Sequence, residues 1–471
     1  MQIKSPFIFI LSIAVCLGIF LFYSHILMHQ GHNWGGDFAL YLSQAKAMLN
    51  GTTNELVANS KLSCELSYYR MNPDVYPAGY PIMLMPVYAI AGLNFVAFKW
   101  INILCFVLFI IFLHLTIRNH TTTTERIILV AILCTSNVFI GFSNHILADV
   151  PLMMFVWLTL FYYEKIDKGK AHHYLILGTL CALNVQVKSL SINLFFSLLL
   201  FESYCAMVSN TTVTLWLKKM LVFVSSFLIV VLIFKLFYPS SSGGYFNQAS
   251  SINIHSILKN IYYYRSIPYW ILHHSNAFVW LSLPAFIIGF VTQLKKQVFY
   301  VLFIVTHLSL IIIWPFQEGI RFLFFLVPFY FIFSFYGFTY LFNQTTTKFN
   351  NYKISYIKYL LWVVIVVYSF IQLNVKLKAN NESDNEIGSA DAVKLMQFVN
   401  EHTMTSDKFV FFKPNVLRLL TNRESFYLLN KEEIINSGAN WWIYKHGDLP
   451  ADTSGMQMIF TNKSFTVFKL N

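Results

Sequence analysis

The sequence predicts an α-helical protein that crosses a membrane many times and carries a small α/β domain at its C-terminal end. Of the 471 residues, 56% are hydrophobic and only 11% are charged, against about 25% charged residues in an average soluble domain. Long apolar runs recur as far as about residue 378, and the residues after that are polar. This composition excludes a single soluble core, because too few polar side chains remain to cover it, and it also excludes disorder.

The apolar runs predict about eleven transmembrane helices. The first run, from about Pro6 to Met28, is long enough to span and lacks the small-residue cleavage site of a signal peptide, so we expect an uncleaved helix. The other runs have about 14–24 residues, where a straight span needs about 20. They lie near 95–117, 127–142, 150–163, 173–187, 190–206, 219–237, 275–293, 298–314, 322–342 and 359–375.

Basic residues set the expected orientation. The net charge is +12, which in a soluble protein would suggest a nucleic-acid partner. Here Lys and Arg collecting in cytoplasmic loops is the simpler explanation, and no nucleic-acid partner is expected. If the N-terminus is cytoplasmic, almost every short inner connection is basic, and an odd number of spans places the C-terminus outside.

Two domains are expected. Residues 1–378 form the transmembrane domain, with a first extracytoplasmic loop at 29–81 that contains juxtamembrane helices, and residues 379–471 form a soluble α/β domain. In this tail, Ser389 is placed to cap a helix from Ala390 to His402. The segments Lys408–Phe412, Trp441–Tyr444 and Phe465–Leu470 are predicted to be strands.

Few carboxylates are available for chemistry on the outer side. Outside the tail they are Asp37, Glu55, Glu65, Asp74, Asp149 and Glu318.

Asp37 follows two glycines, which would let a ligand approach the backbone closely, although an acid after turn glycines is equally typical of a helix N-cap. Asp149 stands shortly before Pro151 at the outer end of a span, where an acid also suits the helix dipole. His145, four residues before Asp149, could share its helix face, but two ligands do not make a metal site.

The segment from Arg70 to Pro81 is rich in Pro and Gly and predicts a rigid, non-helical loop. Its Tyr76 and Tyr80 are either ordinary residues of the aromatic belt or flank a lipid headgroup or sugar. Lys188 and Arg321 are isolated cations at outer helix ends. They either extend toward the membrane surface or hold a phosphate, and Arg321 is also spaced to pair with Glu318.

These segments, taken in order, resemble the GT-C fold glycosyltransferases, polytopic enzymes that use polyprenyl-phosphate sugars. The likeness is greatest to bacterial relatives of protein O-mannosyltransferases and of lipid A aminoarabinose transferase. Relatives often have Glu where Asp149 stands, and often Pro or Gly after the residue that matches Lys188. The matching segments are GDFALY at 36–41, YPAGYP at 76–81, LADVPL at 147–152, VKS at 187–189, QEGIRFL at 317–323, and in the tail KP at 413–414 and TNR at 421–423.

The resemblance implies inverting transfer of a sugar from a polyprenyl-phosphate donor to an envelope glycolipid, glycan or protein, at the extracytoplasmic face of a bacterial cytoplasmic (inner) membrane. It implies Asp37 as the catalytic base, with Asp149 assisting it or orienting the acceptor. Cations must stabilise the departing phosphate, and the candidates are Arg70, Lys188 and Arg321.

The remaining candidates for substrate binding are Tyr76, Tyr80 and Glu318. No cofactor is expected. The first loop has no Asp-x-Asp, and the six cysteines form no CxxC or paired framework. A divalent metal ion therefore stays open but has no support.

Two other functions remain as alternatives. A transporter or flippase of lipid-linked saccharides would favour repeated halves and broken helices at mid-membrane, and the sequence shows neither pattern. An O-antigen polymerase or ligase would carry its functional residues mainly in large outer loops. Here the first loop is the largest, which favours the transferase. The sugar and the acceptor stay open.

Overall fold

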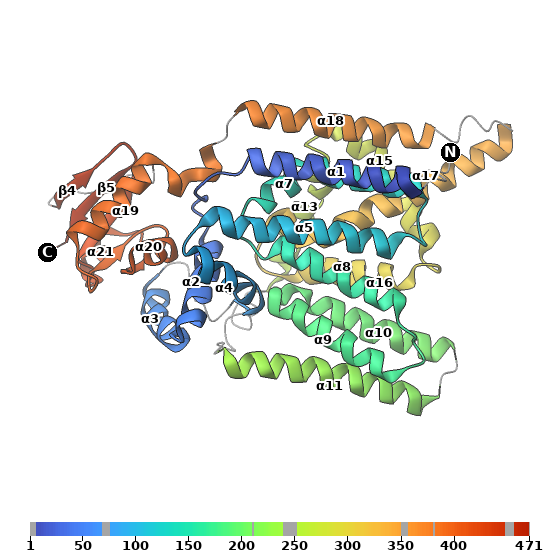
Figure 1. The fold of residues 1–471 in the computed structure, drawn as a ribbon, viewed down its shortest axis with the longest axis horizontal. Coiled ribbons are helices and arrows are strands. Elements are labelled where there is room, and N and C mark those ends of the chain that lie inside the picture. The colour runs from blue at the N-terminus through green and yellow to red at the C-terminus, as the bar shows by residue number, and fades with distance from the viewer. Residues whose placement is uncertain are drawn as a thin grey trace.

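The computed structural model describes residues 6–67, 76–209, 212–238, 252–349, 357–379, 382–447 and 456–470. It is a bundle of long helices with a small sheet domain at one end (Figure 1). The first helix begins at the end of the bundle that lies away from the sheet domain (Figure 1). The side of the membrane on which each end lies stays a prediction.

Among the described residues, seven helices are long and apolar enough to cross a membrane, two of them with a short 3₁₀ segment before them. They are α1 (Pro6–Ile26), α5 (Phe95–Ile117), α10 (Ile192–Val208), α11 (Val213–Phe237), α15 (Asn276–Gln293), α17 (Val327–Phe349) and α18 (Ile357–Ala379). The other apolar runs form α8 (Asp149–Lys165), α9 (Ala171–Val187) and α16 (Val298–Ile313), and the bent pair α6 (Thr123–Thr135) and α7 (Asn137–Ser143). Every predicted run is therefore helical, while the number of spans stays a prediction.

The run predicted as one span at 127–142 is in fact broken. α6 and α7 meet at an angle of 57°. Ser136 between them has φ −73° and ψ 122°, which is extended backbone. The helical hydrogen-bond ladder cannot continue through a residue in that conformation. If the pair is one span, the described part of the chain has eight candidate spans by length and composition.

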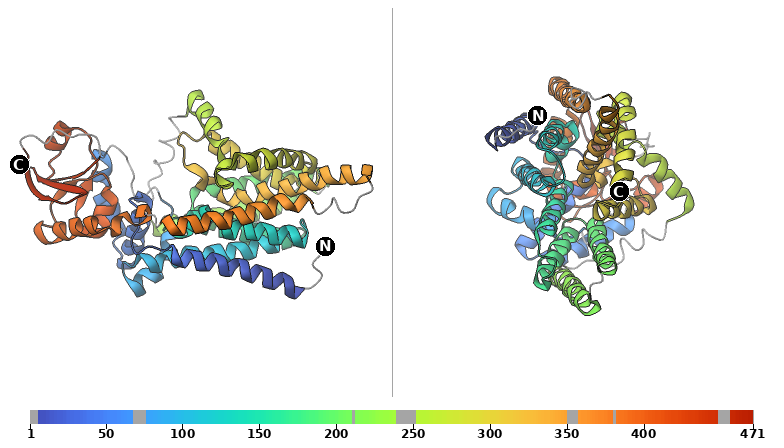
Figure 2. Two further views of the ribbon diagram at one scale, coloured as in Figure 1. Left: turned by 90° about the horizontal axis from the view of Figure 1, so that it is seen from above. Right: turned by 90° about the vertical axis from the view of Figure 1, so that its right-hand side faces the viewer.

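In the described part of the first loop, three helices lie between α1 and α5. They are α2 (Gly36–Asn50), α3 (Thr53–Leu66) and α4 (Gly79–Ala91). Because α4 begins at Gly79, it runs through the predicted end of this loop at residue 81. Figures 1 and 2 show the loop helices between the bundle and the sheet domain.

The C-terminal domain is α/β, as the sequence predicted, and its described residues form a five-stranded sheet with helices. The strand order is β2-β1-β3-β5-β4, with β1 parallel to β2 and β3, and β5 antiparallel to β3 and β4. The elements are η5 (Glu382–Gly388), α19 (Ala390–His402), β1 (Lys408–Val410), α20 (Pro414–Thr421), β2 (Glu424–Phe426), α21 (Lys431–Asn436), β3 (Trp441–Lys445), β4 (Gln457–Thr461) and β5 (Phe465–Lys469).

The predicted cap is confirmed, since the Ser389 hydroxyl accepts a hydrogen bond from the Ala392 N–H at 3.3 Å. The three predicted strands are also present as β1, β3 and β5. The strands β2 and β4 were not predicted.

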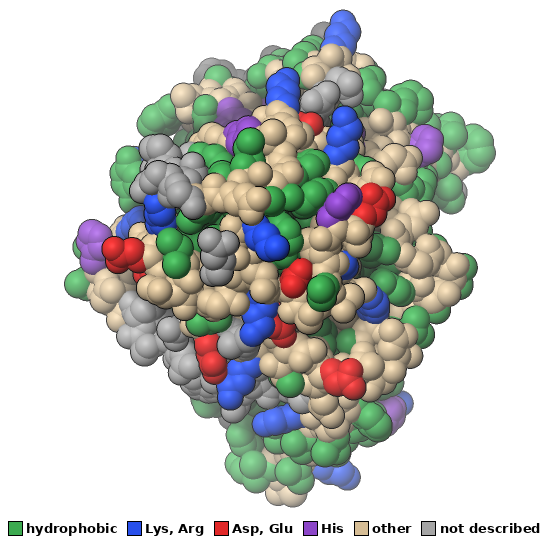
Figure 3. All heavy atoms as spheres, turned by 90° about the vertical axis from the view of Figure 1, so that its left-hand side faces the viewer, with side chains coloured by type: hydrophobic (Ala, Val, Ile, Leu, Met, Phe, Trp, Pro, Cys, Tyr) green, Lys and Arg blue, Asp and Glu red, His purple; other side chains and the backbone are tan. Residues whose placement is uncertain are grey.

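The C-terminal domain is held against the first loop by an aromatic contact and by hydrogen bonds. The Trp34 ring packs edge-on against Phe412 and Phe465, with ring centroids 5.2 and 5.9 Å away. The backbone N–H of Trp34 donates a hydrogen bond to the Glu386 carboxylate at 3.0 Å. Basic and acidic side chains are scattered over the outer face of this end of the molecule (Figure 3), as expected of a surface in water.

Candidate active site

Asp37 lies in the first turn of α2 and does not cap that helix. Gly35 is the N-cap residue, with φ −58° and ψ 133°. The Asp37 carboxylate points instead to two distant donors. It accepts a hydrogen bond from the Tyr76 hydroxyl at 2.8 Å and one from Arg321 Nη1 at 2.8 Å. The N-cap alternative is therefore wrong, and Asp37 is free of helix capping.

Arg321 joins Asp37 to Glu318. It lies in the 3₁₀ helix η3 (Gly319–Leu326), and its Nη2 donates to Glu318 Oε2 at 2.7 Å. The next residue is anchored by α16, since the Phe322 carbonyl lies 2.8 Å from His307 Nε2. The predicted Glu318–Arg321 pair is thus real, but the same guanidinium also reaches the first loop.

Asp149 forms a buried ion pair with Lys188. The distance from Lys188 Nζ to Asp149 Oδ1 is 2.5 Å, and the two side chains are 14% and 2% exposed. Asp149 stands in the first turn of α8, and Lys188 ends α9 with extended backbone. The Lys188 ammonium also lies 4.5 Å from the centroid of the Phe322 ring. Seen from the cavity described next, Asp149 therefore lies behind Lys188.

The Lys188 cavity, of about 370 Å³, brings these groups together. One part of its wall is charged or polar, and another is formed by apolar side chains from α9, α10, α16 and η3. It is lined by Asp37, Tyr41, Tyr76, Pro77, Val185, Lys188, Ser189, Leu190, Ile192, Leu310, Trp314, Glu318, Arg321 and Phe322.

The Lys413 cavity, of about 290 Å³, opens between the first loop and the C-terminal domain. The loop contributes Gly36, Asp37, Leu40, Ser63 and Ser67, and the domain contributes Phe412, Lys413, Pro414, Asn415 and Tyr427. Asp37 is thus in the wall of both cavities. A carboxylate in that position can touch two different substrates at once.

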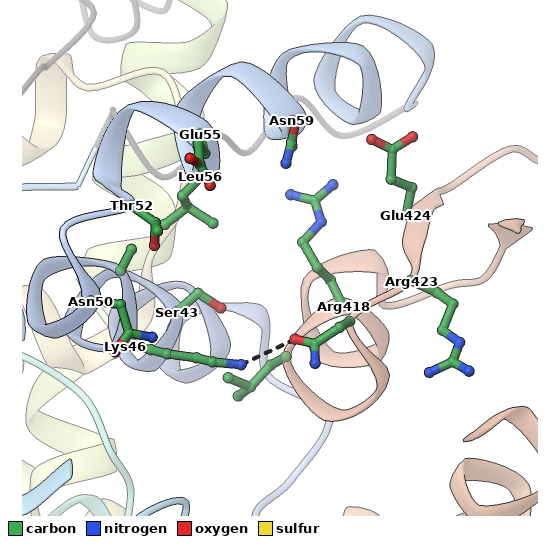
Figure 4. A pocket seen from close by; sticks show the side chains of 13 residues that line it. Ser43, Lys46, Asn50, Thr52, Glu55, Leu56, Asn59, Arg418, Arg423 and Glu424 are labelled. Atoms are coloured by element: carbon green, nitrogen blue, oxygen red, sulfur yellow. Dashed lines mark hydrogen bonds between the residues drawn. The ribbon is translucent and has the colours of Figure 1, made fainter. Parts of the chain in front are cut away.

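The Lys46 cavity, of about 240 Å³, is separate from Asp37. It lies between α2 and α3 on one side and α20 and β2 on the other (Figure 4). Lys46 crosses this interface and donates a hydrogen bond to Asn422 Oδ1 at 3.0 Å, drawn as the dashed line in Figure 4. Arg423 points away from the pocket in the same view.

Gly79 explains why the YPAGYP loop meets the end of α9. A Cβ added at Gly79 would lie 2.6 Å from the Gln186 carbonyl oxygen and 2.9 Å from the Val187 nitrogen. Only glycine allows this approach. The contact places Tyr76 and Pro77 in the same cavity wall as Lys188.

Tyr80 lies in the core, where the sequence analysis expected a substrate-binding residue. Its side chain is fully buried, and its hydroxyl donates to Asn102 Oδ1 at 2.8 Å. Asn102 Nδ2 in turn donates to the carbonyls of His145 and Leu147, just before Asp149. Tyr80 therefore supports the segment that carries Asp149, and neither residue lines the Lys188 cavity. Arg70 lies outside the described residues.

The charge state of Asp37 follows from its neighbours. Burial by itself raises the pKa of the Asp37 carboxyl, but the charge of Arg321 and the hydrogen bonds from Arg321 and Tyr76 outweigh it, so that the pKa lies below its usual value. Asp37 is therefore ionised at neutral pH. An ionised carboxylate can accept a proton, provided that it is released from Arg321.

Within the described part of the chain, no three His, Cys, Asp or Glu side chains come together as metal ligands would. His145 and Asp149 accordingly find no third ligand there.

Sequence reasoning missed one residue that lines the site, Tyr41, and two buried residues that hold neighbouring segments in place. Tyr41 lines the Lys188 cavity, with its ring 5.2 Å from that of Tyr76. Its position four residues after Asp37 on one helix was a usable signal. Lys99 and Asn102 are buried polar residues in the apolar α5, and Lys99 holds the carbonyls of His29 and Gly31. Polar residues inside an apolar run were the available signal there.

One sequence family matches part of the chain, and several solved structures match its fold. Residues 76–238 match the sequence family described as dolichyl-phosphate-mannose-protein mannosyltransferase. No curated protein matches the chain in sequence.

Among solved structures, ArnT from Cupriavidus metallidurans bound to undecaprenyl phosphate is similar over 98% of this chain and 97% of its own, with a TM-score of 0.61 and 10% identity. The same protein in the apo state has a TM-score of 0.62 and 11% identity, again over 98% of this chain and 97% of its own. The oligosaccharyltransferase of Archaeoglobus fulgidus, solved with a tethered acceptor peptide, is similar over 94% of this chain and 69% of its own, with a TM-score of 0.54 and 10% identity.

The fold is therefore the GT-C fold that the sequence motifs led us to expect. The sequence family that matches residues 76–238 is one of mannosyltransferases, and the similar structure from Archaeoglobus fulgidus is an oligosaccharyltransferase.

Proposed function

We propose, from the GT-C fold and the family match of residues 76–238, that this protein moves a sugar from a polyprenyl-phosphate donor to an acceptor hydroxyl at the extracytoplasmic face, with inversion and with Asp37 as the base. The observation that carries the proposal is the position of Asp37 in the walls of both the Lys188 cavity and the Lys413 cavity. A base between two cavities can receive a donor from one side and an acceptor from the other.

The Lys188 cavity suits a lipid phosphate. Lys188 and Arg321 supply positive charge, while Leu190, Ile192 and Leu310 supply apolar surface for the first units of the lipid chain. Cations in a partly buried site bind phosphate more strongly than they do in water. The similar ArnT structure was solved with undecaprenyl phosphate bound, which supports a donor of this class.

Donor binding and activation of the base are coupled through Arg321. Its guanidinium is shared by Asp37 and Glu318. A planar guanidinium also fits a phosphate with two parallel hydrogen bonds. When the phosphate of the sugar donor accepts the hydrogen bonds of Arg321, Asp37 loses its strongest stabilising partner, and its proton affinity rises. The carboxylate then becomes a base only when the donor is in place.

The reaction follows as a single displacement. Asp37 takes the proton of the acceptor hydroxyl while its oxygen attacks the anomeric carbon. The bond from that carbon to the phosphate oxygen breaks, and the polyprenyl phosphate leaves with its charge stabilised by Lys188 and Arg321. One displacement inverts the anomeric carbon. Asp149 acts through Lys188, which it holds in place.

The test is Asp37→Asn in the full-length protein, produced in cells that lack the gene. Mass spectrometry of envelope glycolipids, glycans and proteins identifies the sugar whose addition depends on the wild-type gene. We expect Asp37→Asn to abolish this product while the purified variant still binds undecaprenyl phosphate. Lys46→Ala on the same helix serves as the folding control. Undiminished product in Asp37→Asn would remove Asp37 from the mechanism.

A further inference from the structure

Lys413 brings a cation of the C-terminal domain to the proposed base. It stands between β1 and α20, at the N-cap position of α20, and lines the same cavity as Asp37. The two residues are far apart in sequence and meet only because the first loop and the domain are packed together. The domain therefore contributes to the space in front of Asp37.

Lys413 is half-buried, yet no hydrogen bond or ion pair engages its ammonium group among the described residues. Its neighbour Lys445 is different, since Lys445 pairs with Glu386 at 3.8 Å and lies 5.0 Å from the centroid of the Phe412 ring. A partly desolvated ammonium without a close partner is costly unless a ligand supplies the opposite charge.

The charges around Lys413 also favour the binding of an anion. Burial lowers the pKa of Lys413, the carboxylates of Asp37 and Glu386 raise it, and the nearby charge of Lys445 lowers it, with a net value below the usual one. An anion in the cavity would raise this pKa again and stabilise the charged form of Lys413. Lys413 is therefore suited to bind an anion more than to stabilise the empty fold.

The rest of the cavity wall suits a carbohydrate. Phe412 and Tyr427 present aromatic rings, and Asn415 adds an amide. Ser63 and Ser67 already make hydrogen bonds to β2 and to Tyr427 respectively, so they hold the wall together. Apolar surface with a few placed polar groups is the usual composition of a small-molecule site.

We propose that the Lys413 cavity is the acceptor site and that Lys413 holds an anionic group of the acceptor, a phosphate or a carboxylate close to the hydroxyl that receives the sugar. This inference rests on the proposed function of Asp37 and deepens it by assigning the class of acceptor. The protein then selects acceptors by charge through its C-terminal domain, while the transmembrane part handles the donor.

The experiment compares Lys413→Ala, Lys413→Arg and the control Lys46→Ala, all as full-length purified proteins. Lys46→Ala removes the same charge from the same loop–domain interface but outside the cavity that contains Asp37. The acceptor probe is a total envelope extract of cells lacking the gene, and undecaprenyl phosphate is the donor-site probe. The extract is used untreated, treated with phosphatase, or with its carboxylates amidated.

We expect Lys413→Ala to raise the KM for the untreated extract by about tenfold to a hundredfold, the loss of one charged hydrogen bond. The kcat and the affinity for undecaprenyl phosphate should stay unchanged, and Lys413→Arg should restore part of the loss. One of the two treatments of the extract should lower transfer by the wild type to the level of Lys413→Ala. The treatment that does so identifies the anionic group as a phosphate or a carboxylate. Lys46→Ala should behave as wild type.

Two results would overturn the inference. If Lys413→Ala weakens undecaprenyl phosphate binding, then Lys413 belongs to the donor site. If Lys413→Ala transfers sugar as well as wild type while Asp37→Asn is inactive, then the acceptor is not held by Lys413, although the proposed function stands. Activity of Asp37→Asn, in contrast, counts against the proposed function itself.

Discussion

Asp37 and Arg321 are 284 residues apart in the chain, yet Arg321 Nη1 donates a hydrogen bond to Asp37 Oδ2 at 2.8 Å. Their side chains are 18% and 23% exposed, so this ion pair is screened only partly by water. Because Arg321 also binds Glu318, one guanidinium orients two carboxylates. In the mechanism that we propose, the same group also binds the phosphate of the sugar donor, so that donor binding and activation of the base depend on one residue.

Arg321→Ala should lower kcat by about 100-fold or more, since it removes a charged group that donates hydrogen bonds to the departing phosphate. Arg321→Lys keeps the charge but cannot bind two partners with a rigid fork, so it should recover only part of the rate. Steady-state kinetics of gene-dependent sugar transfer measure both. An Arg321→Ala variant with normal kcat would place the phosphate elsewhere.

Tyr76→Phe should shift the acidic limb of the rate profile to higher pH. The Tyr76 hydroxyl donates to Asp37 and helps to hold its pKa below the usual carboxyl value. Loss of this hydrogen bond raises the pKa, so that the base becomes protonated, and transfer is lost, at a higher pH than in the wild type. The measurement is kcat/KM as a function of pH. A shift toward lower pH, or none, would contradict the assignment of Asp37 as the titrating base.

Removal of either partner of the Asp149–Lys188 pair should destabilise the protein by about 3–5 kcal/mol, because an uncompensated charge would stay buried. The double variant Asp149→Ala with Lys188→Met should lose less than the sum of the two single variants. Thermal unfolding in detergent gives the three values. Additive losses would show that the two side chains do not depend on each other.

Gly79→Ala should destabilise the protein by about 1–3 kcal/mol and reduce transfer, because the added methyl group would overlap the backbone at Gln186 and Val187. The displaced loop would move Tyr76 away from Asp37. Gly18→Ala in α1 is the matched control, since a Cβ there meets nothing within 4 Å. Thermal unfolding and transfer assays compare the two variants. Equal behaviour would mean that the close packing of α4 on α9 is unimportant.

The sequence located the helices well but not their internal geometry. Apolar runs mark where a backbone must satisfy its own hydrogen bonds in lipid, and each run is helical in the structure. The break at Ser136 was not predicted, because Ser is compatible with a continuing helix and only the surrounding packing selects the extended conformation. In the tail, β4 was missed because its side chains are mostly exposed and show no clear alternation.

The candidate site was predicted unevenly, for reasons that differ from residue to residue. Asp37, Lys188, Glu318 and Arg321 were selected as charged residues in the first loop or at the outer ends of apolar helices, and Tyr76 was selected from the loop rich in Pro and Gly. All five line one cavity. Asp149 and Tyr80 were selected by the same reasoning, but both are buried behind that cavity. Position along a helix predicts depth in the membrane and does not predict which side of the helix faces a cavity.

The sequence by itself determined the membrane class, the helical segments and the short list of polar residues near one face, because these follow from hydropathy and from the cost of burying charge. Only the tertiary structure decided which of those residues meet. Asp37 is joined to Arg321 and lies beside Lys413 because three distant segments converge on the first turn of α2. Contacts between such segments depend on the packing of the whole bundle and of the C-terminal domain, which no local pattern of residues encodes.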